Sequence, residues 1–202
     1  MKTRRTSHKV YGAWEYDREI EDLNRLSAQG WQLEKGGCFG STYVKDEQVR
    51  YIYQLDYAPN IEDKDRYLSF FEEQGWEFIN STFNGWHYFR KPYHENMSDE
   101  ETEIYTDKQS LVEMQNRYLK GLIVVSAVYV IMTVTEIVHI ITHGIQINRI
   151  LLIICCLTAS VMMGIASCNI KRKQNGQSQI CDIDINVFVL LLVLIFIFLM
   201  IL

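Results

Sequence analysis

The chain contains one stretch twice, LNRLSAQGWQL at residues 23–33 and LSFFEEQGWEF at residues 68–78, which are 45 residues apart. A second block matches in the same register, because GSTYVK at residues 40–45 aligns with GWHYFR at residues 85–90. One short match would carry little weight, but two blocks at one offset indicate a common origin. We therefore predict an internal duplication in the N-terminal part of the chain.

Both copies contain a Gln-Gly-Trp sequence after an apolar stripe of helical spacing. Glycine readily adopts a positive φ angle in the residue after a helix, so Gly30 and Gly75 are expected to end two helices. The next residues, Trp31 and Trp76, are then expected to fold back on the last helical turn, as in a Schellman motif. We interpret these four residues as structural: a helix stop and a core anchor.

Strands are expected on either side of the two helices. Apolar and polar residues alternate over residues 49–57, which is typical of a strand. Asn84-Gly85 is expected to form a two-residue hairpin turn, and Gly36-Gly37 the turn of the first copy. With a further strand near residues 10–16, each copy is expected to contain the elements strand, helix, strand and strand.

Residues 1–95 are therefore predicted to form an α+β domain, in which a duplicated strand-helix-strand-strand unit builds one largely antiparallel sheet. Both helices are expected on one face of that sheet, and Asp17 and Asp63 are expected to cap them. The other face is rich in Tyr and Trp. It is expected to be an open cleft, or to be covered by the linker or by a partner.

The remainder of the chain is predicted to be a linker and a membrane domain. In the linker, residues 96–119, Ser98 and Glu101 have the spacing of a capping box, and a juxtamembrane helix follows. Residues 120–202 contain apolar runs that are long enough to cross a hydrocarbon core of about 30 Å as helices. Three spans are expected, at about residues 121–141, 150–170 and 185–202.

Basic residues predict the orientation of these spans. With three spans, the N-terminal domain and the loop between the second and third spans share one side of the membrane. That side carries Lys108, Arg117, Lys120, Lys171, Arg172 and Lys173, whereas the other side carries Arg149. Because basic residues collect on the cytoplasmic side, we expect a multi-pass protein of the cell membrane. Its N-terminal domain is expected in the cytoplasm and its C-terminus outside.

Charge and motif content argue against several classes of function. The net charge is −5 and no Lys/Arg stripe occurs in the N-terminal domain, so nucleic acid is not an expected partner. The five cysteines include no Cys-x-x-Cys pair, and neither a disulfide framework nor a zinc site is indicated. Nucleophile-elbow, phosphate-loop and His-Glu-x-x-His motifs are also missing. We expect no cofactor and no enzymatic activity, with a membrane enzyme as the remaining alternative.

Two groups of residues are candidates for binding. The first comprises aromatic residues of the expected strands, which suit a small apolar or cationic ligand or a protein, with core packing as the alternative. These residues are Tyr43, Tyr51, Tyr53, Trp86 and Tyr88. The second group shares one helical face in the first span and has the side chains for a metal or a proton relay. Its members are Glu136, His139 and His143, and the alternative is that they reach interfacial water.

The N-terminal domain resembles a known family. The pattern consists of Glu19, then Leu23-Asn-x-Leu-x-Ala-x-Gly-Trp-x-Leu33, then Tyr51-x-Tyr-x-Leu-Asp-Tyr57. It is similar over about residues 8–95 to the family called domain of unknown function 2812. Such proteins occur in Gram-positive bacteria, are often encoded beside PadR-type transcriptional regulators, and in many cases carry C-terminal membrane spans. The resemblance implies no activity, cofactor or site residue.

These observations favour one function and leave an alternative. A membrane-anchored sensory or regulatory protein is expected, with a cytoplasmic domain that binds a small-molecule ligand or a protein partner. The alternative is an accessory subunit of a membrane transport complex, because three spans are few for a transporter alone. That alternative requires a partner protein or a homo-oligomer.

Overall fold

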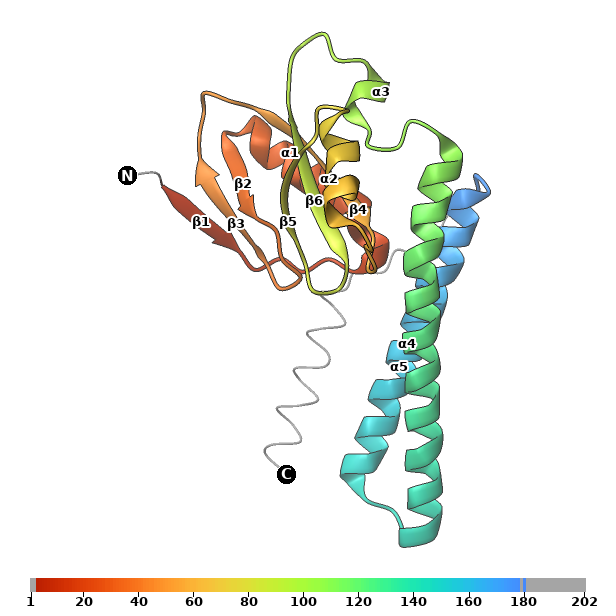
Figure 1. Cartoon of the computed structure of the whole chain (residues 1–202). Coiled ribbons are helices and arrows are strands. Elements are labelled where there is room, and N and C mark those ends of the chain that lie inside the picture. The colour runs from red at the N-terminus through yellow and green to blue at the C-terminus, as the bar shows by residue number, and fades with distance from the viewer. Residues whose placement is uncertain (1–2, 179, 181–202) are drawn as a thin grey trace. The chain divides into compact units, whose positions relative to one another are not determined.

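The computed structural model describes residues 3–178 and residue 180. The chain divides into two compact units, Met1–Arg117 and Tyr118–Leu202 (Figure 1). Helix α4 is continuous across this boundary. The strands are β1 (Arg4–Ser7), β2 (Trp31–Lys35), β3 (Ser41–Lys45), β4 (Tyr51–Tyr57), β5 (Glu77–Ser81) and β6 (Trp86–Pro92). The helices are η1 (Ala13–Glu15), α1 (Tyr16–Ala28), α2 (Lys64–Glu72), α3 (Asp99–Thr102), α4 (Lys108–His143) and α5 (Ile147–Gln174).

The first unit is an α+β domain, as expected, but it contains two sheets and not one. Their strand orders are β1-β3-β2 and β4-β6-β5, and every pairing is antiparallel. Each half of the domain therefore has the element order strand, helix, strand, strand, with its last strand in the middle of its sheet. The repeated order of elements is compatible with an internal duplication. That the two halves arose by duplication stays a prediction.

Backbone irregularities at facing edges explain why the two sheets do not merge. The register shifts between Leu33 and Lys35 in β2, and between Phe78 and Asn80 in β5. The Asn80 side chain then bridges the gap: Gly36 N–H donates to its oxygen (2.8 Å) and its nitrogen donates to the Gly36 carbonyl (2.9 Å). A side chain thus replaces the backbone ladder that a single sheet would need.

The expectation of two helices on one face is also wrong. Phe71 of α2 packs on Phe89 of β6, with ring centroids 4.5 Å apart. Glu19 of α1 instead contacts Tyr88, the neighbouring residue of β6. Successive side chains of a strand point to opposite faces, so α1 and α2 lie on opposite faces of the β4-β6-β5 sheet. The face rich in Tyr and Trp is therefore covered by α1 of the same domain.

Both helices end at the predicted glycines. Gly30 has φ 78° and Gly75 has φ 83°, the left-handed conformation that glycine favours. After α2, the Gly75 and Trp76 N–H groups donate to the carbonyls of Glu72 and Phe71, which are the two bonds of a Schellman motif. In the first copy, Gly30 N–H donates to the Ser27 carbonyl.

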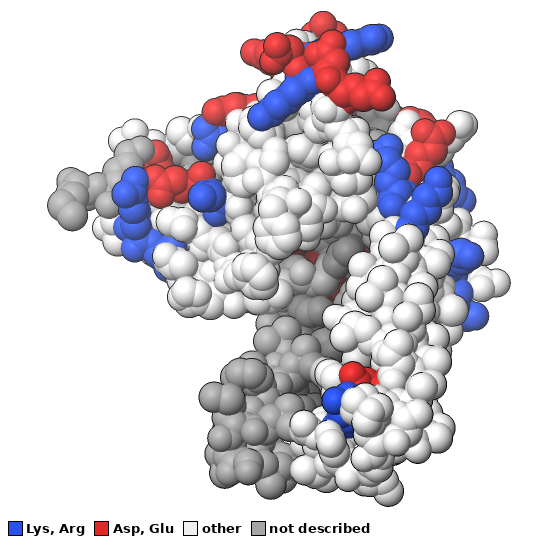
Figure 2. Space-filling view, turned by 60° about the horizontal axis from the view of Figure 1, so that its bottom comes forward, with Lys and Arg blue, Asp and Glu red and all other residues white. Residues whose placement is uncertain are grey.

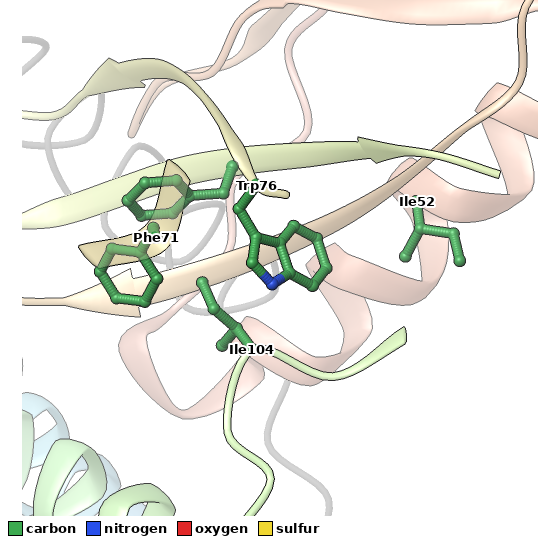
Figure 3. Close-up of a cluster of buried hydrophobic side chains, with 5 residues drawn as sticks. Ile52, Phe71, Trp76 and Ile104 are labelled. Atoms are coloured by element: carbon green, nitrogen blue, oxygen red, sulfur yellow. The ribbon is translucent and has the colours of Figure 1, made fainter. Parts of the chain in front are cut away.

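The side chains after the two glycines differ in burial. Trp76 is 3% exposed and belongs to an apolar cluster with Ile52, Phe71, Phe89 and Ile104. Figure 3 shows its indole between Phe71 and Ile52, above Ile104. Trp31 is only half-buried. The expected core anchor is therefore present in the second copy, while the first copy uses the same signal without enclosing its indole.

Several boundaries differ from those expected. The first strand is β1, not residues 10–16, and a short 3₁₀ turn precedes α1. Asp17 lies inside the first turn of α1, whereas Asp63 does cap α2 and accepts a hydrogen bond from Arg66 N–H (2.9 Å). The β5–β6 hairpin forms where expected, but its loop spans residues 82–85 because β5 ends at Ser81.

The linker and the second unit are helical. Ser98 and Glu101 form the predicted capping box at the start of α3. Helices α4 and α5 are long and apolar enough to cross a membrane, and many of their large apolar side chains are exposed. They contain the first two expected spans. The third, at about residues 185–202, lies outside the described residues.

Charge is distributed unevenly over the first unit. Figure 2 shows most Lys, Arg, Asp and Glu side chains around the edges of the view, whereas its centre is mostly white. The segment that contains α3 is rich in acidic residues, at positions 93–103. The opposite end of the strands has loops without charged residues, at positions 36–40 and 82–85.

Candidate functional site

A buried polar network joins α1 to the free edge of β4. Ser27 Oγ accepts a hydrogen bond from Tyr51 N–H (2.8 Å) and donates to the Tyr51 carbonyl (2.7 Å). Asn24 Oδ1 accepts from Tyr53 N–H (2.7 Å). The backbone groups of an edge strand need partners when they are buried, and two helix side chains supply them here. The Asn of the family pattern therefore has a structural role.

Gln32 and Tyr53 complete this network between the two sheets. The Gln32 amide donates to the carbonyls of Val49 (2.8 Å) and Asp46 (3.1 Å). The Tyr53 hydroxyl accepts from Leu33 N–H (2.9 Å) and donates to Gln32 Oε1 (3.1 Å). Both side chains are buried, so each polar atom has its partner where water is excluded.

A buried carboxyl group lies under the aromatic face. Glu19 of α1 accepts a hydrogen bond from the Tyr88 hydroxyl (2.7 Å), and both residues are buried. Burial raises the pKa of the Glu19 carboxyl to about 7, although the bond from Tyr88 opposes this rise. A group of this kind can hold or release a proton near neutral pH, or neutralise a cation that reaches it.

A more exposed carboxyl group stands one turn further along α1. Asp22 accepts hydrogen bonds from Lys9, Tyr11 and Arg25. Burial alone would raise its pKa, but the bonds from Arg25, Lys9 and Tyr11 lower the pKa to about 2. Asp22 is therefore an ionised partner for the N-terminal segment, while Glu19 is the carboxyl group that titrates near neutrality.

A second buried carboxyl group binds the start of α4. Asp56 of β4 accepts hydrogen bonds from the hydroxyls of Tyr67 (2.6 Å) and Tyr105, and forms an ion pair with Arg117 (3.1 Å). Arg117 also donates through Nε to the Tyr57 carbonyl (2.8 Å). Burial, followed by the charge of Asp56, raises the pKa of both tyrosines, so their hydroxyls remain protonated donors.

Three aromatic side chains pack together where α1 meets β4 and β6. The Trp86 ring lies 5.6 Å from Tyr16, nearly parallel to it, and 5.2 Å from Tyr57. The Tyr16 hydroxyl accepts a hydrogen bond from the side-chain amide of Gln115 (2.9 Å). Two residues of α4, Gln115 and Arg117, therefore bind the domain beside the aromatic face.

The five aromatic candidates do not form one open surface. Tyr43, Tyr53, Trp86 and Tyr88 are buried, and Tyr51 is half-buried with the Arg90 guanidinium 4.4 Å from its ring centroid. Tyr88 and Trp86 meet α1, and Tyr53 joins the polar network. Burial raises the pKa of Tyr43 to about 12. Their packing follows from these contacts, and their role in ligand binding stays a prediction.

The three candidates in the first span, Glu136, His139 and His143, do not all contact one another. Glu136 forms an ion pair with Arg149 (2.6 Å), at the end of the hairpin between α4 and α5. The rings of His139 and His143 stack with centroids 4.1 Å apart. Among the described residues, no group of three or more His, Cys, Asp or Glu side chains is arranged to hold a metal ion.

Sequence reasoning missed the buried charged and polar groups. Glu19 and Asp56 are part of the family pattern, yet no role followed from it. The alternation over residues 49–57 places Asp56 at a polar position of its strand, which gave no sign of burial, and Glu19 stands near an apolar helical stripe. His87, for which no role was predicted, is also buried and contacts Ser81 Oγ (2.8 Å) and the Ala58 carbonyl (2.9 Å).

These features define a class of protein: a two-sheet α+β domain with buried carboxyl groups, followed by long apolar helices. The chain belongs to the family described as protein of unknown function (DUF2812), whose family model matches residues 15–127, more than half of the 202 residues. The match begins after β1 and extends through α3 into α4, beyond the 8–95 expected. No curated protein and no solved structure matches the chain.

Proposed function

We propose that the protein is a membrane-anchored sensory or regulatory protein. Its N-terminal domain binds a ligand or a protein and passes the bound state to the membrane helices through α4. One observation carries the proposal: α4 is a single helix whose first turns bind the domain core and whose later turns are apolar enough to cross a membrane.

The contacts of Arg117 and Gln115 support a coupling role. Asp56 is buried and depends on Arg117 as its charged partner, so a movement of α4 leaves a buried carboxylate poorly compensated. Gln115 reaches Tyr16, which stacks on Trp86. Any ligand that displaces α1 or Trp86 therefore also changes the environment of α4. A sensor requires two states, and such a displacement would supply the second one.

The family match supports the same assignment of roles. It extends from the end of η1 through α3 into the first part of α4, so the family unit includes the connection to the candidate span. A linker that served only as a spacer would not need this helix to bind the domain.

The proposed location is the cell membrane, with the domain in the cytoplasm and the C-terminus outside. Most basic residues near the spans support this orientation. On the opposite side, Arg149 is paired with Glu136, which leaves little net charge there. The third span is part of this proposal.

A ligand screen on the full chain in lipid nanodiscs tests the function. Metabolites, amphiphiles and cationic compounds are screened for a thermal shift. A sensor predicts stabilisation by one chemical class, lost in Trp86→Ala and retained in Phe70→Ala, a matched change of an exposed ring on α2. Hydrogen exchange over residues 108–117 should change with that ligand, and the change should disappear in Asp56→Asn.

The same preparation tests the alternative. If no class of compound shifts the transition, and cross-linking in native membranes captures a larger permease, the sensor proposal is wrong. The chain is then an accessory subunit of a transport complex.

A further inference from the structure

Two phenylalanine side chains project from neighbouring loops of the N-terminal domain. Phe39, in the loop between β2 and β3, is 75% exposed, and Phe83, in the loop between β5 and β6, is 84% exposed. Their rings stack with centroids 6.3 Å apart. Cys38 Sγ also donates to Asn84 Oδ1 (3.0 Å), which holds the loops together. Large exposed apolar side chains that gather in one place mark a contact surface.

This end of the domain carries little charge. The loops at residues 36–40 and 82–85 contain no charged residue, and neither do residues 58–60, which contact the second loop through Ala58 N–H and the Gly85 carbonyl (2.9 Å). Figure 2 brings this end forward and shows its centre white, with red and blue at the edges. Such a surface can leave water without the cost of desolvating ions.

The same end of the domain is where α4 leaves it. Arg117, the last residue of the first unit, donates to the Tyr57 carbonyl (2.8 Å) at the C-terminal end of β4. Ala58, the next residue, binds the loop that carries Phe83. The first predicted span begins at about residue 121, roughly one helical turn after Arg117. Arg117 and the loop that carries Phe83 therefore lie at the same end of the first unit.

We propose that the loop tips carrying Phe39 and Phe83 insert into the lipid interface and hold this end of the domain against the bilayer. Aromatic side chains suit the boundary between headgroups and acyl chains. A surface held in this way would let the domain respond to the lipid next to α4. The inference rests on the membrane location proposed above.

The size of the surface favours lipid over a protein partner. Two phenylalanines bury about 300–500 Å² when they are fully covered. A stable protein interface buries at least about 1,000 Å². Charged residues surround the loops, so the apolar surface does not extend beyond them. A small apolar tip on a tethered domain is enough for a lipid contact, because the anchor keeps the two close together.

Quenching by lipid tests the contact. The full chain, with Phe83→Trp, is reconstituted in phosphatidylcholine vesicles with or without bromine on the acyl chains. The fluorescence of the introduced tryptophan is the difference between the variant and the unchanged chain, which has four tryptophans. This difference should lose most of its intensity in brominated lipid. Phe70→Trp is the matched control, because Phe70 is 58% exposed near the C-terminal end of α2. Its added emission should persist, and equal quenching of the two variants, or none at position 83, would overturn the proposal.

A second measurement does not depend on how the tryptophan variant folds. Phe83 is replaced by the photoreactive analogue p-benzoylphenylalanine in the full chain, and cell membranes are irradiated. A lipid adduct supports the proposal, whereas cross-linking to a second copy or to another protein, or no adduct, contradicts it. If alkaline carbonate washes the chain from membranes, the membrane location fails as well. If the chain stays embedded without lipid contact at position 83, only this inference fails.

Discussion

The two halves of the N-terminal domain have the same order of elements and the same Gln-Gly-Trp signal, yet they bury the tryptophan of that signal to different depths. In the second half, Trp76 lies in an apolar cluster and Lys91 stands over its indole, with Nζ 5.5 Å from the ring centroid. In the first half, Trp31 stays half-buried between Arg5 and Lys45, at 5.9 Å and 5.3 Å. A local signal can therefore end a helix in both halves without deciding how deep the next side chain lies.

The two halves also differ in their buried carboxyl groups. Glu19 in the first half has one tyrosine hydroxyl as its hydrogen-bond donor. Asp56 in the second half has two tyrosine hydroxyls and an arginine. The poorly compensated group titrates near neutral pH, while the well-compensated one binds α4. The two halves therefore place their buried carboxyl groups in different environments.

The largest expected difference between the halves is in the tryptophans. Trp76→Ala should lower the free energy of unfolding of the domain by about 3–5 kcal/mol, because it leaves a cavity in the apolar cluster. Trp31→Ala should cost less than half of this, because its indole is already partly in water. Urea unfolding of the full chain in detergent, followed by circular dichroism, gives both values. Equal losses would mean that the two indoles contribute alike.

The next difference concerns pH. The pKa of Glu19 is raised to about 7 in the folded domain, so folding retains a proton that the unfolded chain releases above pH 4.5. The stability should therefore fall as the pH rises from about 5 to 8, by at most about 3 kcal/mol. Glu19→Gln should remove most of this slope, as measured by urea unfolding at several pH values. A slope that survives in this variant would assign it to another group.

The glycines provide a test in which the halves should agree. Gly30→Ala and Gly75→Ala each place a side chain at positive φ, at a cost of about 1–2 kcal/mol. The added Cβ would meet the flexible side chains of Glu47 (2.7 Å) and Lys91 (3.2 Å), both of which can move. Gly85→Ala should cost more, because its Cβ would meet the Pro59 backbone at 2.7 Å. Thermal unfolding of the three variants checks this order.

The smallest expected effect comes from the lysines over the indoles. Lys45→Ala and Lys91→Ala should each cost about 0.5–1 kcal/mol, the usual strength of an exposed cation–π contact. Lys45 also forms an ion pair with Glu47 (2.8 Å), which adds little at the surface. A double variant with the matching Trp→Ala change should show no further loss. An additive loss would mean that the lysine acts elsewhere.

Local chemistry was readable from the sequence because it depends on residues close together in the chain. The glycine helix stops, the Asp63 cap, the Ser98–Glu101 capping box and the β5–β6 hairpin were all predicted, and the structure contains them. The α+β class and two of the long apolar helices followed from periodicity and length. The family was also recognisable from its spaced residues.

Long-range pairing was decided only in the tertiary structure. The separation into two sheets depends on bulges in β2 and β5 and on Asn80 bridging to Gly36, residues 44 positions apart. The covering of the aromatic face depends on α1 crossing to the other sheet, where Glu19 meets Tyr88. The pattern of side chains predicts that a face is apolar, but it does not predict which element will cover that face. That choice depends on the free energy of the whole packed domain, in which contacts between distant residues compete.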